Sequence, residues 1–262
     1  MDKQKINYQK KLDEVLKEIE KSLENGEKKP TLLLHACCGP CSSYCLEYLT
    51  KYFQTTVLYY NPNIYPEAEY KRRFQELKNL YKDFPPAING NVKVVELPYV
   101  PEDFYGAVKT REQPELAKEP EKGERCRRCY ELRLKAAFNY AAENDFDYFC
   151  TTLSISPFKD AEKINNIGAA IEWEANAKAS LEIEQFSKVA AGAEELSQNV
   201  GKLSHNGRVP KWLFSDFKKK GGFKRSLEIS DEFDMYRQEY CGCVYSYRSR
   251  EEYEKRLKES EK

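Results

Sequence analysis

Seven of the nine cysteines of this 262-residue chain fall into three clusters, and these clusters are where chemistry is expected. They are Cys37, Cys38 and Cys41 in HACCGPCSS, Cys126 and Cys129 in RCRRC, and Cys241 and Cys243 in YCGC. Clustered thiolates bind zinc, bind an iron–sulfur cluster, or pass electrons by thiol–disulfide exchange. Four thiolates suffice for a metal centre, so seven leave a surplus, and spacing alone leaves all three kinds of site open.

Other catalytic motifs are missing from the sequence. His35 and His205 are the only histidines, and His35 lies in a predicted strand, where a hydrogen-bonded role is expected. No Ser-His-Asp or Cys-His set is evident, and neither glycine-rich nucleotide motif occurs. The remaining cysteines, Cys45 and Cys150, follow apolar patterns and are expected in the core. Electrons would therefore reach a substrate through metal or sulfur.

The elements that must position the thiols alternate between strand and helix. Strands are predicted within 31–35, 55–61, 91–97, 146–156 and 212–217, and helices within 7–25, 41–50, 66–83, 126–143, 159–177 and 226–240. The first cysteine cluster follows a strand, and Cys126 and Cys129 share one face of a helix's first turn. Parallel strands would bring these segments to one sheet edge.

This alternation predicts an α/β fold with a doubly wound, mostly parallel, Rossmann-like sheet. We expect an N-terminal helix within 1–30 and a single α/β metal-binding domain over 31–262, ending in a charged helix. The stretch from about 172 to 210 is predicted to be an inserted helix and loop. The acidic segment 102–123 is predicted to be a loop-rich lid.

Charge and hydropathy say little about partners. Lys plus Arg equals Asp plus Glu, at 43 each, so any nucleic-acid surface must come from local basic clusters. Lys218–Lys220, Lys224 and Arg225 form one such cluster, interleaved with glycine and Phe223. The sequence has neither a signal peptide nor a spanning segment, so we expect a cytoplasmic protein with no membrane partner.

Six motifs between about Thr31 and Val244 resemble the cobalamin-independent epoxyqueuosine reductases, the QueH family. In order they are HACCGPCSS, YNPNIYP, ERCRRCYELRL, TTLSISPFKDAEKINNIG, SDFKKKGGFKRS and YRQEYCGC. The resemblance implies reduction of epoxyqueuosine to queuosine at the wobble position of tRNA, with an external electron donor and no cobalamin. It also implies a [4Fe–4S] cluster held by Cys37, Cys38, Cys126 and Cys129.

For Cys241 and Cys243 the resemblance leaves two roles open, a redox-active disulfide or ligation of an additional iron ion. The role of Cys41, near the cluster, is also open, and Tyr240 is a candidate proton donor beside Cys241. Phe158 stands where His is expected, and 172–210 is longer than expected for the family. These departures put an acid–base role at position 158 and the mode of substrate binding in doubt.

The expected substrate lies in an anticodon loop, whose bases can be splayed out and stacked on aromatic rings. Tyr59, Tyr60, Tyr65 and Phe223 are candidates for such stacking. The alternatives to the reductase are a zinc-stabilised tRNA-binding protein without redox activity and a thiol–disulfide oxidoreductase.

Overall fold

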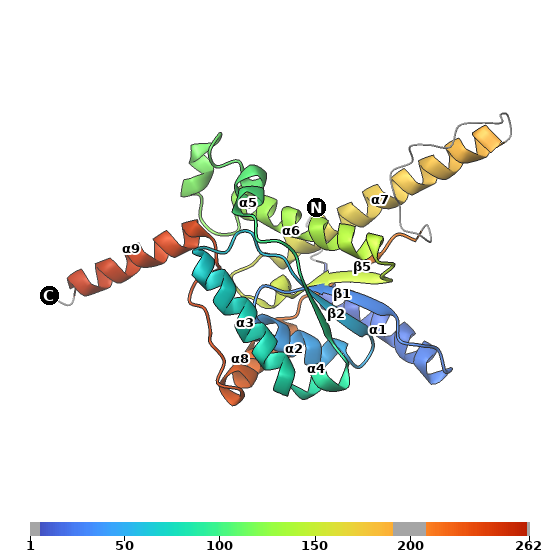
Figure 1. Cartoon of the computed structure of the whole chain (residues 1–262), viewed down its shortest axis with the longest axis horizontal. Coiled ribbons are helices and arrows are strands. Elements are labelled where there is room, and N and C mark those ends of the chain that lie inside the picture. The colour runs from blue at the N-terminus through green and yellow to red at the C-terminus, as the bar shows by residue number, and fades with distance from the viewer. Residues whose placement is uncertain (1–5, 191–207, 261–262) are drawn as a thin grey trace.

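Helices surround one parallel sheet in the computed structural model, which describes residues 6–190 and 208–260 (Figure 1). The strands are β1 (Thr31–His35), β2 (Gln54–Tyr59), β3 (Lys93–Glu96), β4 (Tyr148–Thr151) and β5 (Lys211–Trp212). The α-helices are α1 (Tyr8–Glu24), α2 (Gly39–Leu49), α3 (Glu67–Asp83), α4 (Pro85–Asn89), α5 (Pro101–Val108), α6 (Glu124–Glu143), α7 (Ala161–Ala190), α8 (Gly222–Glu232) and α9 (Val244–Ser260). Three short 3₁₀ helices complete the described elements: η1 (Pro114–Lys118), η2 (Thr152–Ile155) and η3 (Lys219–Gly221).

The sheet has the order β3-β2-β1-β4-β5, and all of its printed pairings are parallel. The chain therefore winds outward from β1 to one edge and then returns to build the other half. The order reverses between β1 and β4, which pair in register from Leu32 opposite Tyr148 to His35 opposite Thr151. In such sheets ligands bind beyond the carboxyl ends of the strands at this switch point. The prediction of a doubly wound α/β fold is confirmed.

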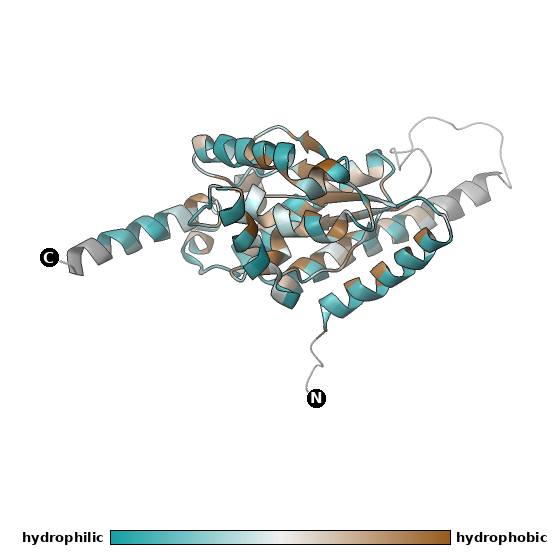
Figure 2. Ribbon diagram, turned by 90° about the horizontal axis from the view of Figure 1, so that it is seen from below, coloured by the Kyte–Doolittle hydropathy of each residue, from teal (hydrophilic) through white to brown (hydrophobic). Residues whose placement is uncertain are grey.

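Both faces of the sheet are buried, and alternating side chains on β1 divide the core. Leu32 and Leu34 join the cluster beneath α1, α2 and α3, whereas Leu33 joins the cluster beneath α6 and α7. Because both faces are covered, the central strands contain consecutive apolar residues, Leu32–Leu34 in β1 and Val57–Tyr59 in β2, rather than a strict alternation with polar residues. Figure 2 shows the same arrangement, with brown central strands and teal outer helix faces.

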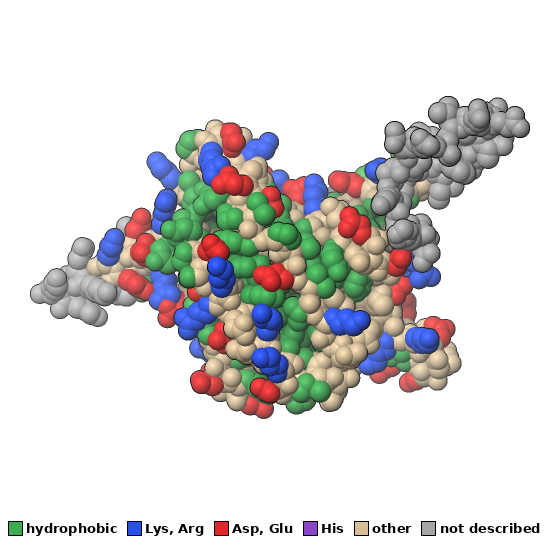
Figure 3. Space-filling model, viewed as in Figure 1, with side chains coloured by type: hydrophobic (Ala, Val, Ile, Leu, Met, Phe, Trp, Pro, Cys, Tyr) green, Lys and Arg blue, Asp and Glu red, His purple; other side chains and the backbone are tan. Residues whose placement is uncertain are grey.

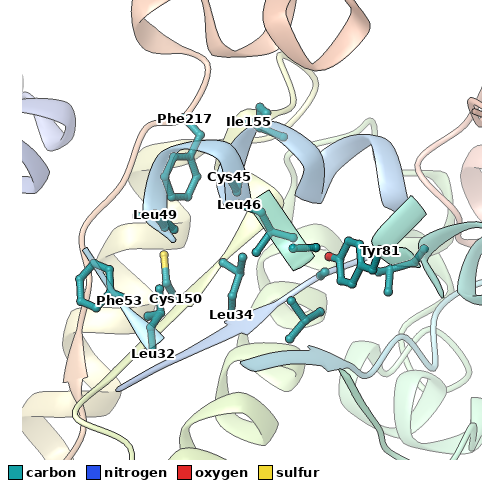
Figure 4. Packing of buried hydrophobic residues seen from close by; sticks show 14 of the residues in the cluster. Leu32, Leu34, Cys45, Leu46, Leu49, Phe53, Tyr81, Cys150, Ile155 and Phe217 are labelled. Carbon is teal, nitrogen blue, oxygen red and sulfur yellow. The ribbon is translucent and has the colours of Figure 1, made fainter. Parts of the chain in front are cut away.

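Cys45 and Cys150 lie in the first of these clusters, both with no exposed surface. Figure 4 shows them among Leu46, Leu49 and Phe217. The Cys150 thiol donates to the Leu213 carbonyl at 3.3 Å. These two cysteines are core residues, as predicted.

Several predicted boundaries were wrong. The segment predicted as a loop-rich lid contains α5 and η1, and the long predicted fourth strand ends at Thr151, where η2 begins. Strand β5 has only two residues, and α8 ends at Glu232 rather than near Tyr240. After α8 the chain runs to α9 without a regular element, so the position of residues 233–243 depends on isolated contacts with the rest of the fold.

The predicted insertion begins inside α7, which continues unbroken to Ala190. Its later part, 191–207 with His205, lies outside the described residues. Helix α1 packs on the sheet through Leu12, Leu16 and Ile19, whereas α9 projects away from the body (Figure 1). In the described part of the chain, no helix combines the length and apolar character needed to cross a membrane.

Candidate functional site

The first cysteine cluster sits in the turn from β1 into α2, at the switch point of the sheet. The Sγ atoms of Cys37, Cys38 and Cys41 all lie within 4.8 Å of one another, and those of Cys37 and Cys38 are 3.8 Å apart. Cys38 is the N-cap residue of α2, and Pro40 occupies the first turn. The thiols thus meet the positive end of the helix dipole, which favours thiolate over thiol.

The other two cysteine clusters face each other nearby. Cys126 and Cys129 lie in the first turns of α6, while Cys241 and Cys243 stand where the irregular segment enters α9. All four line one small cavity of about 20 Å³. The Sγ atoms of Cys241 and Cys243 are 3.9 Å apart.

A wider cavity of about 490 Å³ adjoins the small one and reaches the first cluster. Cys37, Cys41 and Cys241 line it, and Cys241 lines both cavities. Cys126 belongs to the apolar cluster that contains Cys37 and Cys38. The fold thus brings three remote cysteine clusters to adjoining cavities at one end of the sheet.

The cations Arg133 and Lys159 lie close enough to these thiols to interact with them electrostatically. Arg133, only 3% exposed, donates from Nε to the Cys129 carbonyl at 3.2 Å, and it lines the small cavity. Lys159 lines both cavities. The ion pairs found among the described residues include neither side chain. A buried cation needs a compensating negative charge.

This arrangement fits an anionic metal centre bound by thiolates. Cysteine thiolates are the ligands of both iron–sulfur clusters and structural zinc, and either complex would carry negative charge toward Arg133 and Lys159. The residues present therefore suit such a group. The geometry does not choose between iron and zinc.

The pKa shifts favour a thiolate at Cys37 in the first cysteine cluster and another at Cys241 in the C-terminal pair. Hydrogen bonds from Cys38 and Cys41 hold the pKa of Cys37 well below its usual value, and a hydrogen bond from Cys243 does the same for Cys241. Burial would lower the pKa of Lys159, but its charged neighbours, Cys241 foremost, raise it.

Helix α3 holds the C-terminal cysteine pair in place. Arg73, 1% exposed, donates to the carbonyls of Tyr240 at 3.3 Å and Cys241 at 3.4 Å, and its Nε donates to Glu69 at 2.7 Å. The backbone N–H of Tyr65 donates to the Gly242 carbonyl at 2.8 Å. Gly242 has φ +121°, and a Cβ there would lie 3.0 Å from Arg73 Nη1, so this turn requires glycine.

The segment before the pair also contacts α3. The Tyr236 hydroxyl donates to Glu69 at 3.1 Å, and the ring of Tyr236 lies beneath the Arg72 guanidinium. Gln238 Nε2 then donates to Cys38 Sγ at 3.0 Å, which links this segment to the first cysteine cluster. We call residues 235–242 with Glu69, Arg72 and Arg73 the α3 clamp.

Tyr240, the predicted proton donor, lies in the wall of the wide cavity. Its hydroxyl donates to the Tyr65 carbonyl, and burial raises the pKa of Tyr240. Proton donation to a substrate would require that hydrogen bond to open.

His35 is fully buried and hydrogen-bonded, as the sequence predicted. Its Nε2 donates to the Tyr60 carbonyl at 3.0 Å, so Nδ1 accepts from the Thr151 hydroxyl at 2.8 Å. Burial lowers its pKa to about 4, which keeps the ring neutral. His35 therefore ties β1 to the strands on both sides beneath the cysteine turn.

The residues predicted to contact tRNA separate into accessible and inaccessible groups. Tyr59 is fully buried and Tyr60 is 8% exposed, so neither ring is free to stack on a base. Tyr65 is 43% exposed, and Phe223 lines the wide cavity.

The predicted basic cluster is largely neutralised. Lys220 pairs with Asp13 at 2.8 Å, Arg225 pairs with Glu47 at 2.8 Å, and Lys218 pairs with Asp216 at 2.7 Å. Opposite charges are also interspersed across the face shown in Figure 3. The cluster is thus a weaker candidate for phosphate binding than its sequence suggested.

The sequence interpretation missed Arg73, Arg133, Lys159 and Gln238. Arg133 follows Cys129 by four residues and so shares its helix face, a signal that could have identified it. Lys159 directly follows Phe158 in a motif already singled out. The contacts of Arg73 with the Cys241 carbonyl and of Gln238 with Cys38 each span more than 160 residues, so no local pattern reveals them.

Comparison with known proteins places the chain in a family. The family model for "Epoxyqueuosine reductase QueH" matches residues 32–201 and 192–249. Proteins of that name from Streptococcus pyogenes serotype M1 and Staphylococcus aureus are each 37% identical, over 93% and 94% of this chain and 79% and 86% of theirs. The protein of that name from Thermotoga maritima is 30% identical over 85% of this chain and 93% of its own length. The chain therefore belongs to the QueH family of epoxyqueuosine reductases.

Proposed function

We propose that this protein is an oxidoreductase that reduces epoxyqueuosine in tRNA to queuosine. The observation that carries the proposal is the gathering of seven thiols, with Arg133 and Lys159 beside them, at the sheet's switch point, in a chain of this family. The reaction breaks both C–O bonds of the epoxide and forms a carbon–carbon double bond. It consumes two electrons and two protons and releases the oxygen as water.

We assign Cys37, Cys38, Cys126 and Cys129 to a [4Fe–4S] cluster. Such a cluster, when bound, supplies electrons one at a time. Cys41 adds a third sulfur within 4.8 Å of Cys37 and Cys38, so it is available to an additional iron ion or to a substrate-facing role. Arg133 would offset the negative charge of the thiolate centre.

Cys241 and Cys243 have two candidate roles. As a dithiol they can close to a disulfide, which releases two electrons and two protons, the number that the epoxide consumes. An external donor must then reduce the disulfide. Alternatively, both sulfurs bind the additional iron. The sulfur separation of 3.9 Å is compatible with either role.

The remaining residues bind and orient the substrate. The wide cavity lies over Cys37, Cys41 and Cys241, and its volume of about 490 Å³ falls within the range of small-ligand sites. Phe223 and Leu227 contribute apolar surface to the wall of this cavity. Lys159, which also lines it, can donate a hydrogen bond to a substrate oxygen. A flipped base could enter here with its cyclopentane ring toward the sulfurs.

The decisive experiment is anaerobic purification of the full chain, followed by metal analysis and an assay on tRNA that carries epoxyqueuosine. We expect brown protein with about four irons and four sulfides in the cluster, and conversion of the base when a strong reductant is added. Colourless protein that contains zinc and binds tRNA without converting it would support the tRNA-binding alternative. Disulfide exchange without epoxide reduction would support a general thiol–disulfide oxidoreductase.

A further inference from the structure

An exposed phenylalanine stands at the rim shared by the two cavities. Phe158 is 65% exposed and lines both the small and the wide cavity. Complete burial of a phenylalanine side chain stabilises a fold by about 1.5–3 kcal/mol, and only part of this stabilisation is gained at position 158. Single exposed apolar side chains are common, so exposure alone carries no conclusion. The position of this ring is what carries the inference.

The backbone around Phe158 is fixed by hydrogen bonds. Its N–H donates to the Ser156 hydroxyl at 3.3 Å, and the next N–H, that of Lys159, donates to the Ser156 carbonyl at 3.2 Å. Lys122 Nζ donates to the Pro157 carbonyl at 3.2 Å. This loop follows η2 at the switch point of the sheet, so the ring is presented from a defined backbone.

The surroundings of the ring match an RNA base better than an apolar partner. Lys159 adjoins it in the sequence and lines the same two cavities, and Lys122 contacts its loop. Phe223 also lines the wide cavity. Aromatic rings beside cations are the usual means of holding unpaired bases, since the ring stacks and the cations attract phosphate.

We infer that Phe158 is the platform on which the wobble base of the tRNA anticodon loop stacks at the mouth of the wide cavity. The inference rests on the proposed function and adds a specific recognition residue to it. In this arrangement the base lies over Phe158, and its cyclopentane substituent extends inward toward Cys37 and Cys241. The ring holds and orients the substrate without taking part in the redox chemistry.

The test measures binding of an anticodon stem-loop RNA with guanine at the wobble position, and of a matched RNA that is abasic there. Stacking is worth about 1–3 kcal/mol per base, so Phe158→Ala should weaken binding of the first RNA roughly 5- to 150-fold. Phe158→Tyr, which retains a ring, should bind within about twofold of the parent. Phe158→Leu, apolar but without a ring, should resemble the alanine variant.

The abasic RNA isolates the stacking partner. With it the parent protein should lose affinity, and Phe158→Ala should cause no further loss. Trp173→Ala is the matched control, because Trp173 is 71% exposed on α7 and lines neither cavity. This control should bind both RNAs like the parent.

Two outcomes would overturn the role of Phe158. One is parent-like binding by Phe158→Ala, and the other is an equal loss of affinity with the base present and absent. If the parent reduces epoxyqueuosine while either result holds, only the role of Phe158 fails. If the parent neither binds the stem-loop nor reduces the base, the proposed function fails first and takes this inference with it.

Discussion

Replacing Arg73 by methionine tests whether the α3 clamp positions the C-terminal cysteine pair. The variant would leave Glu69, whose side chain is 10% exposed, without its cationic partner, and would remove the donors to the Tyr240 and Cys241 carbonyls. Breaking a buried ion pair by removing one partner costs about 3–5 kcal/mol. We expect a loss of that size in the free energy of unfolding, measured by urea denaturation of the metal-free protein.

A double variant separates the ion pair from the clamp. Glu69→Gln removes the orphaned charge, so Arg73→Met with Glu69→Gln should lose less stability than Arg73→Met alone. Both variants should still lose epoxide reduction, because the carbonyls of the cysteine turn remain without donors.

Thiol alkylation followed by mass spectrometry should show Cys241 and Cys243 reacting faster, with Cys45 and Cys150 still protected. Lys71→Met is the matched control on the same helix, because Lys71 pairs only with exposed Glu67 and is no part of the clamp. A loss below about 1 kcal/mol for Arg73→Met, within the range of an exposed pair, together with unchanged alkylation, would refute the clamp.

Four further predictions follow from the site and its surroundings. Replacing Cys37, Cys38, Cys126 or Cys129 by alanine should lower iron content and visible absorption; full iron in two of these variants would contradict the ligand assignment. Cys241→Ser and Cys243→Ser should keep most of the cluster absorbance but lose epoxide reduction, whereas Cys45→Ser and Cys150→Ser keep both, and parent-rate turnover in either C-terminal variant would exclude the pair from the mechanism. Arg133→Met should lower iron retention during gel filtration while Arg127→Met, on the outer face of α6, leaves it unchanged; equal retention would show that Arg133 does not offset the metal centre. Burial alone would raise the pKa of Asp13, but hydrogen bonds from Lys220, Gln9 and Tyr48 lower it, so the charged form is favoured in the fold. Asp13→Asn should therefore cost up to about 1 kcal/mol at pH 7, a difference that shrinks as pH falls below about 4; a constant difference from pH 7 to pH 3 would rule out this linkage.

The sequence predicted what depends on local pattern and missed what depends on distant contacts. Apolar runs identified β1 and β2, and helical spacing placed Cys126 and Cys129 on one face of α6. The strand in 146–156 was predicted too long, because apolar residues continue into η2 and a buried 3₁₀ turn has the same composition as a buried strand. Segment 102–123 was predicted to be a loop-rich lid because it is acidic and contains prolines. However, Pro114 begins η1 within it and Pro101, just before it, begins α5, since a missing N–H costs nothing in the first turn of a helix.

The prediction that the basic cluster binds tRNA stays a prediction, but the fold weakens it for a similar reason. Lys220 and Arg225 have their partners, Asp13 and Glu47, on α1 and α2, far away in the sequence. A run of cations predicts a phosphate site only if the fold leaves it unpaired. Conversely, Arg133 and Lys159 stand out only after the fold shows them beside the cysteines.

The three cysteine clusters are held by structures of unequal rigidity. Cys37 and Cys38 follow a central strand that pairs on both sides, and Cys126 and Cys129 belong to a long helix that packs on the sheet. Cys241, in contrast, ends a segment without regular structure, and its position depends on Arg73, Tyr65 and Gly242. Local opening is easiest where few backbone hydrogen bonds must break. Of the three cysteine clusters, the C-terminal pair is therefore the one whose movement requires the least free energy. A pair that must exchange electrons with an outside donor benefits from that freedom, whereas ligands of a permanent metal centre benefit from the rigid strand and helix that carry the other two clusters.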